Sequence, residues 1–359
     1  MPKINLKTIL TFAVQKNASD IHLQVGEPPI LRLQGELIHI KHPPLTDEDM
    51  LAIGMNLTGM TDPGMFQKEI REYDGSFQLD DLSRFRVNVF RQNGRYAVVM
   101  RVIPLEIRSF ADLNLPPVLS RISDLRCGLI LVTGATGMGK STTMAAMINH
   151  INHTRHCHIV TIEDPIEFIY KNKSAIISQR EVGIDTDSFN TALRSAMRQD
   201  PDLIMVGELR DLQTVDTCLK AAETGHLVMG SIHTPDVLRT FGRLIGIFPT
   251  EEHQNLRQRL AENLMAIVSL KLLVNKEGTN LVPACEVLIV NKTIEVCIKN
   301  PEKTVEIPKY MEKNKDLGMQ TFDQHLVEMV EANKITLAEA KNASFHPDQL
   351  ERNLTIVGQ

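Results

Sequence analysis

The stretch GATGMGKSTT, residues 134–143, constrains the fold of this chain more than any other feature of the sequence. It follows directly on the apolar run Gly128–Thr133, matches the pattern G-x-x-x-x-G-K-[S/T], and precedes residues with helical spacing. In a strand–loop–helix unit of this kind, the glycines let successive backbone N–H groups point into one concavity that accepts phosphate oxygens. A glycine-rich turn without a ligand is the alternative, and the flanking strand and helix argue against it.

The loop and the first turn of the following helix predict a nucleotide site. Lys140 places a positive charge near the β- and γ-phosphates, and the hydroxyl group of Ser141 suits a magnesium ion. We therefore expect ATP and Mg²⁺ as the bound groups. The predicted contacts are Gly134, Ala135, Thr136, Gly137, Met138, Gly139, Lys140, Ser141 and Thr142, with Ser141 as the metal ligand.

Downstream of the loop, short continuous apolar runs alternate with helical stretches. The runs are HIVTIE at 158–163, DLIMVGE at 202–208 and HLVMGSIHT at 226–234. Strands that are buried on both faces by crossover helices have this pattern. It predicts an α/β domain with a mostly parallel sheet.

Carboxylates at the ends of two of these runs are candidates for the chemistry of hydrolysis. Glu163 and Glu208 each close a run, and ligands of parallel sheets bind beyond the carboxyl ends of the strands. Because an unpaired charge is costly at the end of a buried run, we predict that Glu208 orients the attacking water. For the neighbouring Asp164 and Asp211, a helix-capping role is at least as well supported as catalysis.

His226 and His233 bracket the last of the apolar runs. Their separation places them on opposite faces of a strand, which argues against a shared metal site. From the residues alone, a structural role and a role near the γ-phosphate remain open.

The first hundred residues have a different pattern. Residues 3–16 and 46–70 have helical spacing, whereas 30–40 and 83–104 alternate apolar and polar residues around glycine-containing turns. The alternation predicts antiparallel hairpins, so this part of the chain is expected to form an α+β domain with one sheet.

The expected domain boundary lies at a Pro-Pro pair, residues 116–117, which cannot continue a helix or a central strand. We predict a first domain over 1–107, a linker over 108–122 and a second domain over 123–359. The last hundred residues favour helices, most clearly at AENLMAIVSLKLL, 261–273.

A group of arginines interleaves with apolar residues along the hairpin predicted at 83–104. A solvated basic face of the sheet is the simpler interpretation. In the sharper one, one or two of them reach a nucleotide held by a neighbouring subunit and stabilise the transition state. The group comprises Arg84, Arg86, Arg91, Arg95 and Arg101.

Composition argues against several classes of protein. Lys and Arg total 39 against 44 Asp and Glu, a net charge of -5 without a basic tail, so a nucleic-acid partner is not expected. The 5 cysteines have no Cys-x-x-Cys spacing, which favours reduced thiols over a zinc site or a disulfide framework. The N-terminus is too polar for a signal peptide, and no apolar run approaches the roughly 20 residues of a membrane-spanning helix. We expect a cytoplasmic protein with no integral membrane segment.

Several further blocks of sequence resemble one family. They are SDIHLQVGEPPILRLQGEL (19–37), RFRVNVFRQNG (84–94), TIEDPIEF (161–168), SQREVGIDTDSF (178–189), ALRSAMRQDPDLIMVGELRD (192–211), AAETGHLVMGSIHT (221–234) and GMQTFDQHL (318–326). With the phosphate loop, these blocks are part of a resemblance that extends over nearly the whole chain. The chain resembles the type IV pilus retraction ATPases (PilT/PilU-like) of the secretion ATPase superfamily.

The resemblance implies a PAS-like first domain, a RecA-like ATPase domain and a homo-hexameric ring. Glu163 falls in the family's acidic box and Glu208 at the Walker B position of the catalytic glutamate, while two histidines fall in the His box. Two of the arginines are favoured as residues that act in trans. The implied catalytic residues are Glu208, Glu163, His233, His226, Arg86 and Arg101.

The implied function is a motor that hydrolyses ATP to retract the pilus and drive twitching motility. It would act at the inner membrane on the pilus platform protein, with a paralogous retraction ATPase as a possible second partner. An accessory PilU-like ATPase and a type II secretion or extension ATPase are the alternatives. The tetracysteine zinc insertion common in the latter is lacking here.

Two positions depart from the family pattern. Met138 stands where a small residue is usual in the loop, which need not block phosphate because backbone N–H groups make that contact. Glu295, within Thr293–Lys299, stands where the family's retraction-associated segment has an arginine. The reversed charge favours the accessory alternative.

Overall fold

The computed structural model describes residues 5–33, 35–79, 82–103 and 106–357. The chain divides into two compact units, one of residues 1–106 with 167–169 and the other of residues 107–166 with 170–359. Each unit is described by itself below.

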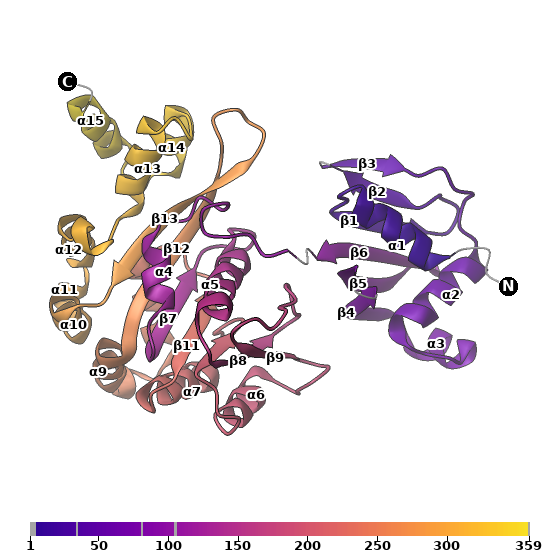
Figure 1. Ribbon diagram of the computed structural model, residues 1–359, viewed down its shortest axis with the longest axis horizontal. Helices are drawn as coiled ribbons and strands as arrows, with labels where there is room; N and C mark the ends of the chain where they lie inside the picture. Colours follow the sequence, from indigo (N-terminus) through magenta and orange to yellow (C-terminus); the bar gives the residue numbers. More distant parts are fainter. Residues whose placement is uncertain (1–4, 34, 80–81, 104–105, 358–359) are drawn as a thin grey trace. The chain divides into compact units, whose positions relative to one another are not determined.

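The first unit is an antiparallel sheet in the order β3-β2-β1-β6-β5-β4, with helices on one face (Figure 1). Leu10, Ile53 and Phe66 from the helices pack on Phe85 and Val87 of the sheet. The elements are α1 (Leu6–Gln15), β1 (Asp20–Gln24), β2 (Ile30–Leu33), β3 (Glu36–His39), α2 (Asp47–Thr58), α3 (Pro63–Glu69), β4 (Glu72–Leu79), β5 (Ser83–Gln92) and β6 (Arg95–Ile103).

Both hairpins predicted from alternation are present, as β2–β3 and β5–β6. The second turns at Asn93-Gly94, where both residues have positive φ, 50° and 76°. Such a turn matches the right-handed twist of the strands and favours this dipeptide. Residue 104, the last of the predicted hairpin, lies outside the described residues.

The second unit is built on a mixed sheet in the order β13-β12-β7-β11-β10-β8-β9, in which only β13 is antiparallel to its neighbour among the described strands. This confirms the prediction of an α/β fold with a mostly parallel sheet. The strands are β7 (Gly128–Thr133), β8 (His158–Glu163), β9 (Ile176–Glu181), β10 (Leu203–Val206), β11 (Leu227–Ile232), β12 (Leu264–Val274) and β13 (Leu281–Ile289).

Helices cover both faces of this sheet and form a separate core on each (Figure 1). Leu119, Met147 and Ile130 of β7 belong to the core on one face. Leu193, Leu219 and Leu131 of the same strand belong to the core on the other. The helices are α4 (Val118–Ser123), α5 (Lys140–Thr154), α6 (Phe189–Ala196), α7 (Leu212–Glu223), α8 (Val237–Ile247) and α9 (His253–Asn263), with a 3₁₀ turn η1 (Thr250–Glu252).

The segment 108–122, which we expected to be a linker, belongs to the second unit. It contains most of α4, and Leu115, Leu119 and Ile122 are buried in the core beside α5. The division between the units falls instead between Glu106 and Ile107.

The helix predicted at 261–273 is wrong, because α9 ends at Asn263 and the following residues form β12. A run that is apolar on all sides has no helical or strand periodicity of its own, and its β-branched pair Ile267-Val268 suits a strand buried on both faces. Within the sheet, β12 lies between β7 and β13.

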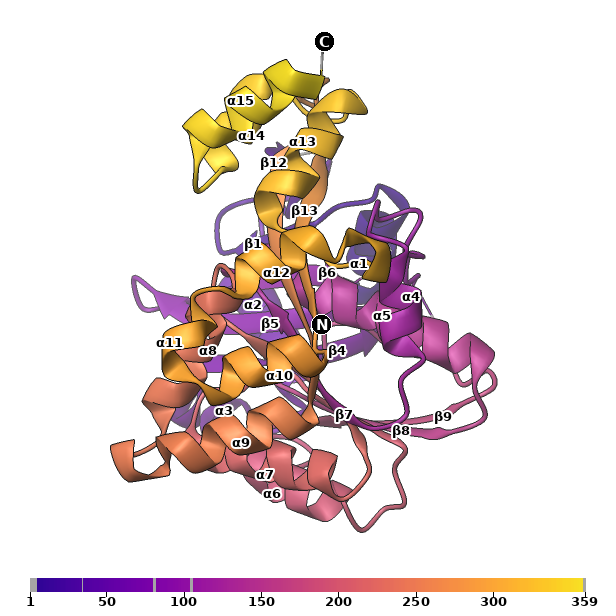
Figure 2. The ribbon, with the colours of Figure 1, turned by 90° about the vertical axis from the view of Figure 1, so that its left-hand side faces the viewer.

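The remaining residues after β13 are mainly helical, as expected. Helices α13 and α14 pack at one end of β13 and β12, where Figure 2 shows them with α15. These elements are α10 (Lys292–Lys299), α11 (Pro301–Thr304), α12 (Ile307–Lys313), the 3₁₀ turn η2 (Lys315–Leu317), α13 (Phe322–Glu331), α14 (Leu337–Ala343) and α15 (Pro347–Val357). Within the described ranges, every helix is too short or too polar to cross a membrane.

Candidate nucleotide site

The loop between β7 and α5 has the backbone of a phosphate-binding loop. Gly134, Gly137 and Gly139 have positive φ values of 148°, 79° and 83°. A Cβ atom on Gly134 would also lie 2.7 Å from the carbonyl oxygen of Leu270, so both backbone angle and space require glycine there. The loop leads into the N-terminus of α5, whose first N–H groups have no carbonyl partners within the helix.

A chain of polar contacts joins three adjacent strands at their carboxyl ends. Lys140 Nζ donates to the carbonyl oxygens of Gly134 and Ala135, at 2.9 Å each, and lies 3.3 Å from Nδ1 of His233. His233 Nε2 lies 3.2 Å from Oε2 of Glu208. Because these residues follow β7, β11 and β10, which are neighbours, the strand order brings them together.

The bonding partners assign the tautomer of His233. The Lys140 ammonium has only protons to give, so Nδ1 accepts, and Nε2 carries the proton that is donated to Glu208. His233 thus links the loop lysine to the predicted water-orienting glutamate.

Arg210 is a further member of this cluster that sequence reasoning missed. Its Nη2 lies 2.7 Å from Oε2 of Glu208. Burial raises the pKa of Glu208, but the hydrogen bonds from Arg210 and His233 and the positive charge beside the carboxylate outweigh burial, so the pKa lies below its usual value. Glu208 is therefore a carboxylate at neutral pH, which is the form that accepts a proton or orients water.

A cavity of ≈ 190 Å³ lies on one side of the loop. Gly139, Thr142 and Thr143 form its loop side, and Leu272 and Pro283 contribute from β12 and β13. Arg108, Asp112 and Leu113 complete the wall from the segment that we had expected to be a linker. No motif marked these residues, because the pocket exists only once that segment packs against α5.

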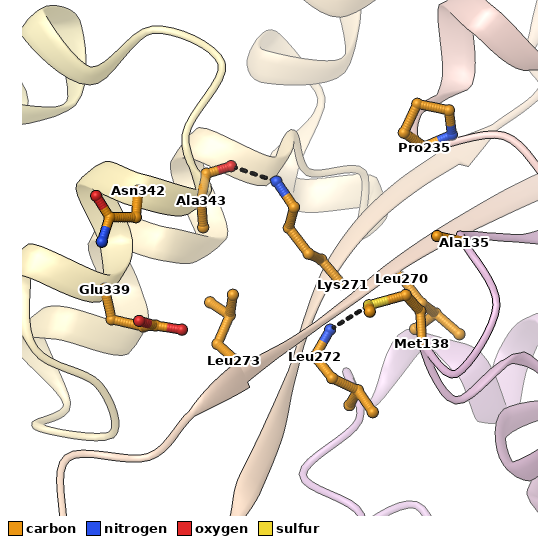
Figure 3. A pocket seen from close by; sticks show the side chains of 10 residues that line it. All are labelled: Ala135, Met138, Pro235, Leu270, Lys271, Leu272, Leu273, Glu339, Asn342 and Ala343. Atoms are coloured by element: carbon orange, nitrogen blue, oxygen red, sulfur yellow. Dashed lines mark hydrogen bonds between the residues drawn. The ribbon is translucent and has the colours of Figure 1, made fainter. Parts of the chain in front are cut away.

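A second cavity of ≈ 260 Å³ lies on the other side of the loop, between β12 and α14 (Figure 3). Met138, the unusual loop residue, borders both cavities. Its sulfur accepts the backbone N–H of Leu272 at 3.3 Å, and the bond is drawn in Figure 3. On the far side, Lys271 Nζ donates to the carbonyl oxygen of Ala343 at 2.7 Å. Met138 therefore anchors the loop to β12 through its side chain.

Glu163 lies at the same edge of the sheet, at the end of β8, but outside the contact chain. Its Oε1 accepts hydrogen bonds from Thr161 Oγ1 at 2.7 Å and from Gln179 Nε2 at 3.2 Å, and the residue is buried. At the usual strand spacing of about 4.8 Å, β8 is roughly 14 Å from β7 in this sheet order. Thr161 and Gln179 thus hold the carboxylate of Glu163 in place.

His226 is placed at the opposite edge of the sheet. It directly precedes β11, whose first residue, Leu227, pairs with the first residue of β7. Its Nδ1 lies 3.0 Å from the carbonyl oxygen of Ala221 and 3.1 Å from Oγ1 of Thr224. The structure therefore brings His233, but not His226, to the loop of this chain.

Asp211 caps α7, since its carboxylate accepts from the backbone N–H of Thr214 at 2.9 Å. This confirms the capping alternative for Asp211. Asp164 is exposed and contributes negative charge near Arg210.

In the first unit, Arg86 and Arg101 are cross-strand partners on β5 and β6, and both are exposed. Nε of Arg101 donates to Asp20 at 3.0 Å. Within the described part of the chain, Arg86 makes no ion pair. Facing cations of this kind repel each other unless an anion lies between them.

Known proteins have similar sequences and a similar fold. A model of the family described as Type II/IV secretion system protein matches residues 2–348. The type IV pilus retraction ATPase PilT of Pseudomonas aeruginosa is 40% identical over 345 residues, covering 96% of this chain and 99% of that protein. The type IV pilus ATPase PilU of the same species is 34% identical over 337 residues, covering 94% and 86%. A crystal structure of the pilus retraction motor PilT with bound ADP has a TM-score of 0.88 and 42% identity, covering 98% of this chain and 100% of that one.

The fold and the loop define a P-loop secretion ATPase, and the chain belongs to the type II/IV secretion system protein family. Within that family it is a PilT/PilU-like ATPase.

Proposed function

We propose that this protein is a Mg²⁺-dependent ATPase that drives retraction of type IV pili. The observation that carries the proposal is the contact chain Lys140–His233–Glu208, which joins a phosphate-binding lysine to an ionised carboxylate across adjacent strands. The type IV pilus retraction ATPase PilT of Pseudomonas aeruginosa is similar to this chain over nearly its whole length.

The loop and α5 bind the phosphates of ATP. The N–H groups at the start of α5 donate to phosphate oxygens, and Lys140 exchanges its carbonyl contacts for the β- and γ-phosphates. The half-buried Ser141 in the first turn of α5 offers a hydroxyl oxygen, a ligand type that suits Mg²⁺. When bound, Mg²⁺ neutralises charge on the phosphates. The cavity lined by Arg108, Asp112 and Thr142 has the position to hold the nucleoside.

Glu208 orients the water that attacks the γ-phosphate. Arg210 and His233 hold its carboxylate. His233 also contacts Lys140, so the imidazole connects the lysine to the glutamate. We retain Glu163 as a residue that supports this edge of the sheet. His226 is left out of the proposed machinery because of its place at the opposite edge.

Two substitutions separate binding from hydrolysis. Lys140→Ala is expected to weaken ATP binding by about 100-fold, because it removes the ammonium that contacts the phosphates. Glu208→Gln should keep nucleotide binding and lower kcat by about 1,000-fold, within the range for loss of a positioned base. Calorimetric titration with ATP and a steady-state phosphate-release assay measure the two effects.

Glu277→Gln, at an exposed turn position, is the matched control and should behave as the parent. In cells, the Glu208→Gln gene should leave more surface pili than the parent gene if the motor retracts them, and fewer if it extends them. Hydrolysis by Glu208→Gln at the parent rate contradicts the assignment of the base.

We further propose that the first unit is PAS-like, the second RecA-like, and the working form a homo-hexameric ring. Arg86 and Arg101 then supply positive charge in trans to the nucleotide of a neighbouring subunit. Their exposure, and the lack of an ion pair for Arg86 within the described residues, support this role.

Mixed rings test action in trans. Arg86→Ala and Lys140→Ala rings should each hydrolyse ATP at least about 100-fold more slowly than the parent. Rings from the two variants co-expressed should recover turnover, because Lys140→Ala subunits still donate Arg86 to intact loops next door. Failure of the mixture to exceed either variant alone argues that Arg86 does not act across subunits.

The ring would work in the cytoplasm against the pilus platform protein at the inner membrane. An accessory role beside a paralogous retraction ATPase is the second candidate, and Glu295 favours it. On α10, Glu295 pairs with Lys292 at 2.8 Å, so this helix presents a carboxylate where retraction motors are expected to present an arginine. A six-membered ring with robust turnover in the phosphate-release assay supports the motor; a ring that binds ATP and stays inert supports the accessory role.

A further inference from the structure

We propose that Glu286, on β13, is a positioning residue that ties the strand before the phosphate loop to the start of α8 and thereby places His233. This inference rests on the proposed ATPase function. Glu286 touches neither the loop nor the predicted water site, and no motif of the sequence marks it.

A row of side chains crosses three adjacent strands. Thr133 pairs with Ser269 on β12, and Ser269 pairs with Glu286 on β13. Direct cross-strand partners lie on one face of a sheet, so these side chains stand side by side. Thr133 Oγ1 donates to Ser269 Oγ at 2.9 Å, Ser269 is hydrogen bonded to Glu286, and all three residues are buried.

Each end of the row reaches a segment of the nucleotide site. Thr133 is the last residue of β7, directly before Gly134 of the loop. At the other end, Glu286 Oε2 accepts the backbone N–H of Val237, the first residue of α8, at 2.8 Å. The short segment from His233 to Val237 is therefore held at both ends, by Lys140 and Glu208 on one side and by Glu286 on the other.

The carboxyl group of Glu286 is buried without a cationic partner among the described residues, which is unusual for a glutamate. Glu286 is 6% exposed, and in the described ranges no Lys or Arg forms an ion pair with it. Burial raises its pKa to about 8 against the opposing effect of the Val237 N–H bond, and the charges of Asp236 and Asp323 raise it further. At neutral pH the group is thus mostly a neutral acid whose contacts are hydrogen bonds.

A neutral acid suits a connector between two backbone segments. It receives the N–H of α8 on one oxygen and still bonds to Ser269, without an ionic partner that would compete for it. The first N–H of a helix has no carbonyl partner within the helix, and Glu286 supplies one from outside. Without this acceptor the start of α8 is less firmly held. The His233 ring is then no longer fixed in position between Lys140 and Glu208.

The test compares Glu286→Leu with the conservative Glu286→Gln. Leu removes the acceptor, and kcat should fall by about 10-fold or more while the Kd for ATP changes less than about threefold, because the loop is untouched. Gln keeps a carbonyl acceptor for Val237 and should restore kcat to within about threefold of the parent. Glu277→Gln on the same hairpin is the control.

Val237→Pro tests the same bond from the other side. Proline lacks the N–H donor, but it is favoured at the first position of a helix, and Asp236 before it is already extended, with φ -154° and ψ 171°. This variant should reproduce the loss of kcat even if Glu286→Leu does not fold. Combined with His233→Ala, either change should add little further loss, because both act through His233.

A parent-like kcat in both Glu286→Leu and Val237→Pro overturns the inference. So does a double variant with His233→Ala in which the two losses of kcat add in full. In either case the proposed function stands if Glu208→Gln is still inactive. An inert parent protein instead overturns the proposed function, so the two failures are distinguishable.

Discussion

Two glutamates near the nucleotide site, Glu208 and Glu286, show how one residue type takes opposite forms in two regions of one sheet. Glu208 lies at the carboxyl edge, partly exposed, with Arg210 and His233 on its carboxylate, and its pKa is lowered. Glu286 lies inside the fold, bonded to Ser269 and a backbone N–H, and its pKa is raised to about 8. The first is charged and the second mostly neutral at pH 7.

The difference in ionisation corresponds to a difference in role: Glu208 takes part in the chemistry, and Glu286 positions the backbone. A carboxylate that orients water has to be ionised and within reach of solvent, which cations at an open edge provide. A carboxyl group that fixes two backbone segments works better without charge, because a buried charge would need a cation of its own. Both groups converge on the segment that carries His233.

Substituting His233 is expected to have a large effect on kcat, larger than the effect of substituting Glu286 on stability. His233→Ala removes the link between Lys140 and Glu208, and kcat should fall by about 1,000-fold while ATP still binds through the loop. Arg210 remains as the partner of Glu208, so the carboxylate stays ionised. The phosphate-release assay beside calorimetric ATP titration measures this.

His226→Ala is the matched control, since the same residue type is replaced at the opposite edge of the sheet. It should leave kcat within about threefold of the parent, as for a surface change away from the site. Equal losses in the two histidine variants contradict the placement of the site at one edge.

The individual motifs of this site could be predicted from the sequence, but the contacts between them could not. The loop, its lysine and Glu208 at the end of an apolar run follow from local patterns, and so do β8, β10 and β11. The contact of Lys140 with His233 depends on β11 lying between β7 and β10, which no local pattern encodes.

The same limit explains the errors. The sequence left open which of the two histidines that bracket β11 lies beside the phosphate loop, and His226 and His233 lie at opposite ends of that strand. The prediction of a helix at 261–273 fails because a fully apolar run has no period that distinguishes helix from strand. With β12 missing from the prediction, the row from Thr133 to Glu286 could not be found.

The smaller effect concerns stability and comes from Glu286→Gln. The folded protein holds the proton of Glu286 up to a pH of about 8, whereas in the unfolded chain the pKa is near the ordinary value of 4.5. The folded state therefore binds more protons than the unfolded state between these values, and the free energy of unfolding falls as pH rises through that window. Gln carries no such proton, so the variant gains stability relative to the parent as pH rises.

The expected slope is at most about 1.4 kcal/mol per pH unit, or roughly 2 kcal/mol between about pH 6 and pH 7.5. The charged groups around Glu286 are Asp236 and Asp323, which raise its pKa. Arg239 forms an ion pair with Asp236, and Lys271 interacts with Asp323. Denaturant unfolding of parent and variant, at fixed protein concentration and several pH values, gives the difference. Glu277→Gln should show no such trend, because its side chain is exposed. A flat difference across this range would mean that Glu286 is ionised in the fold, and that the two glutamates are alike after all.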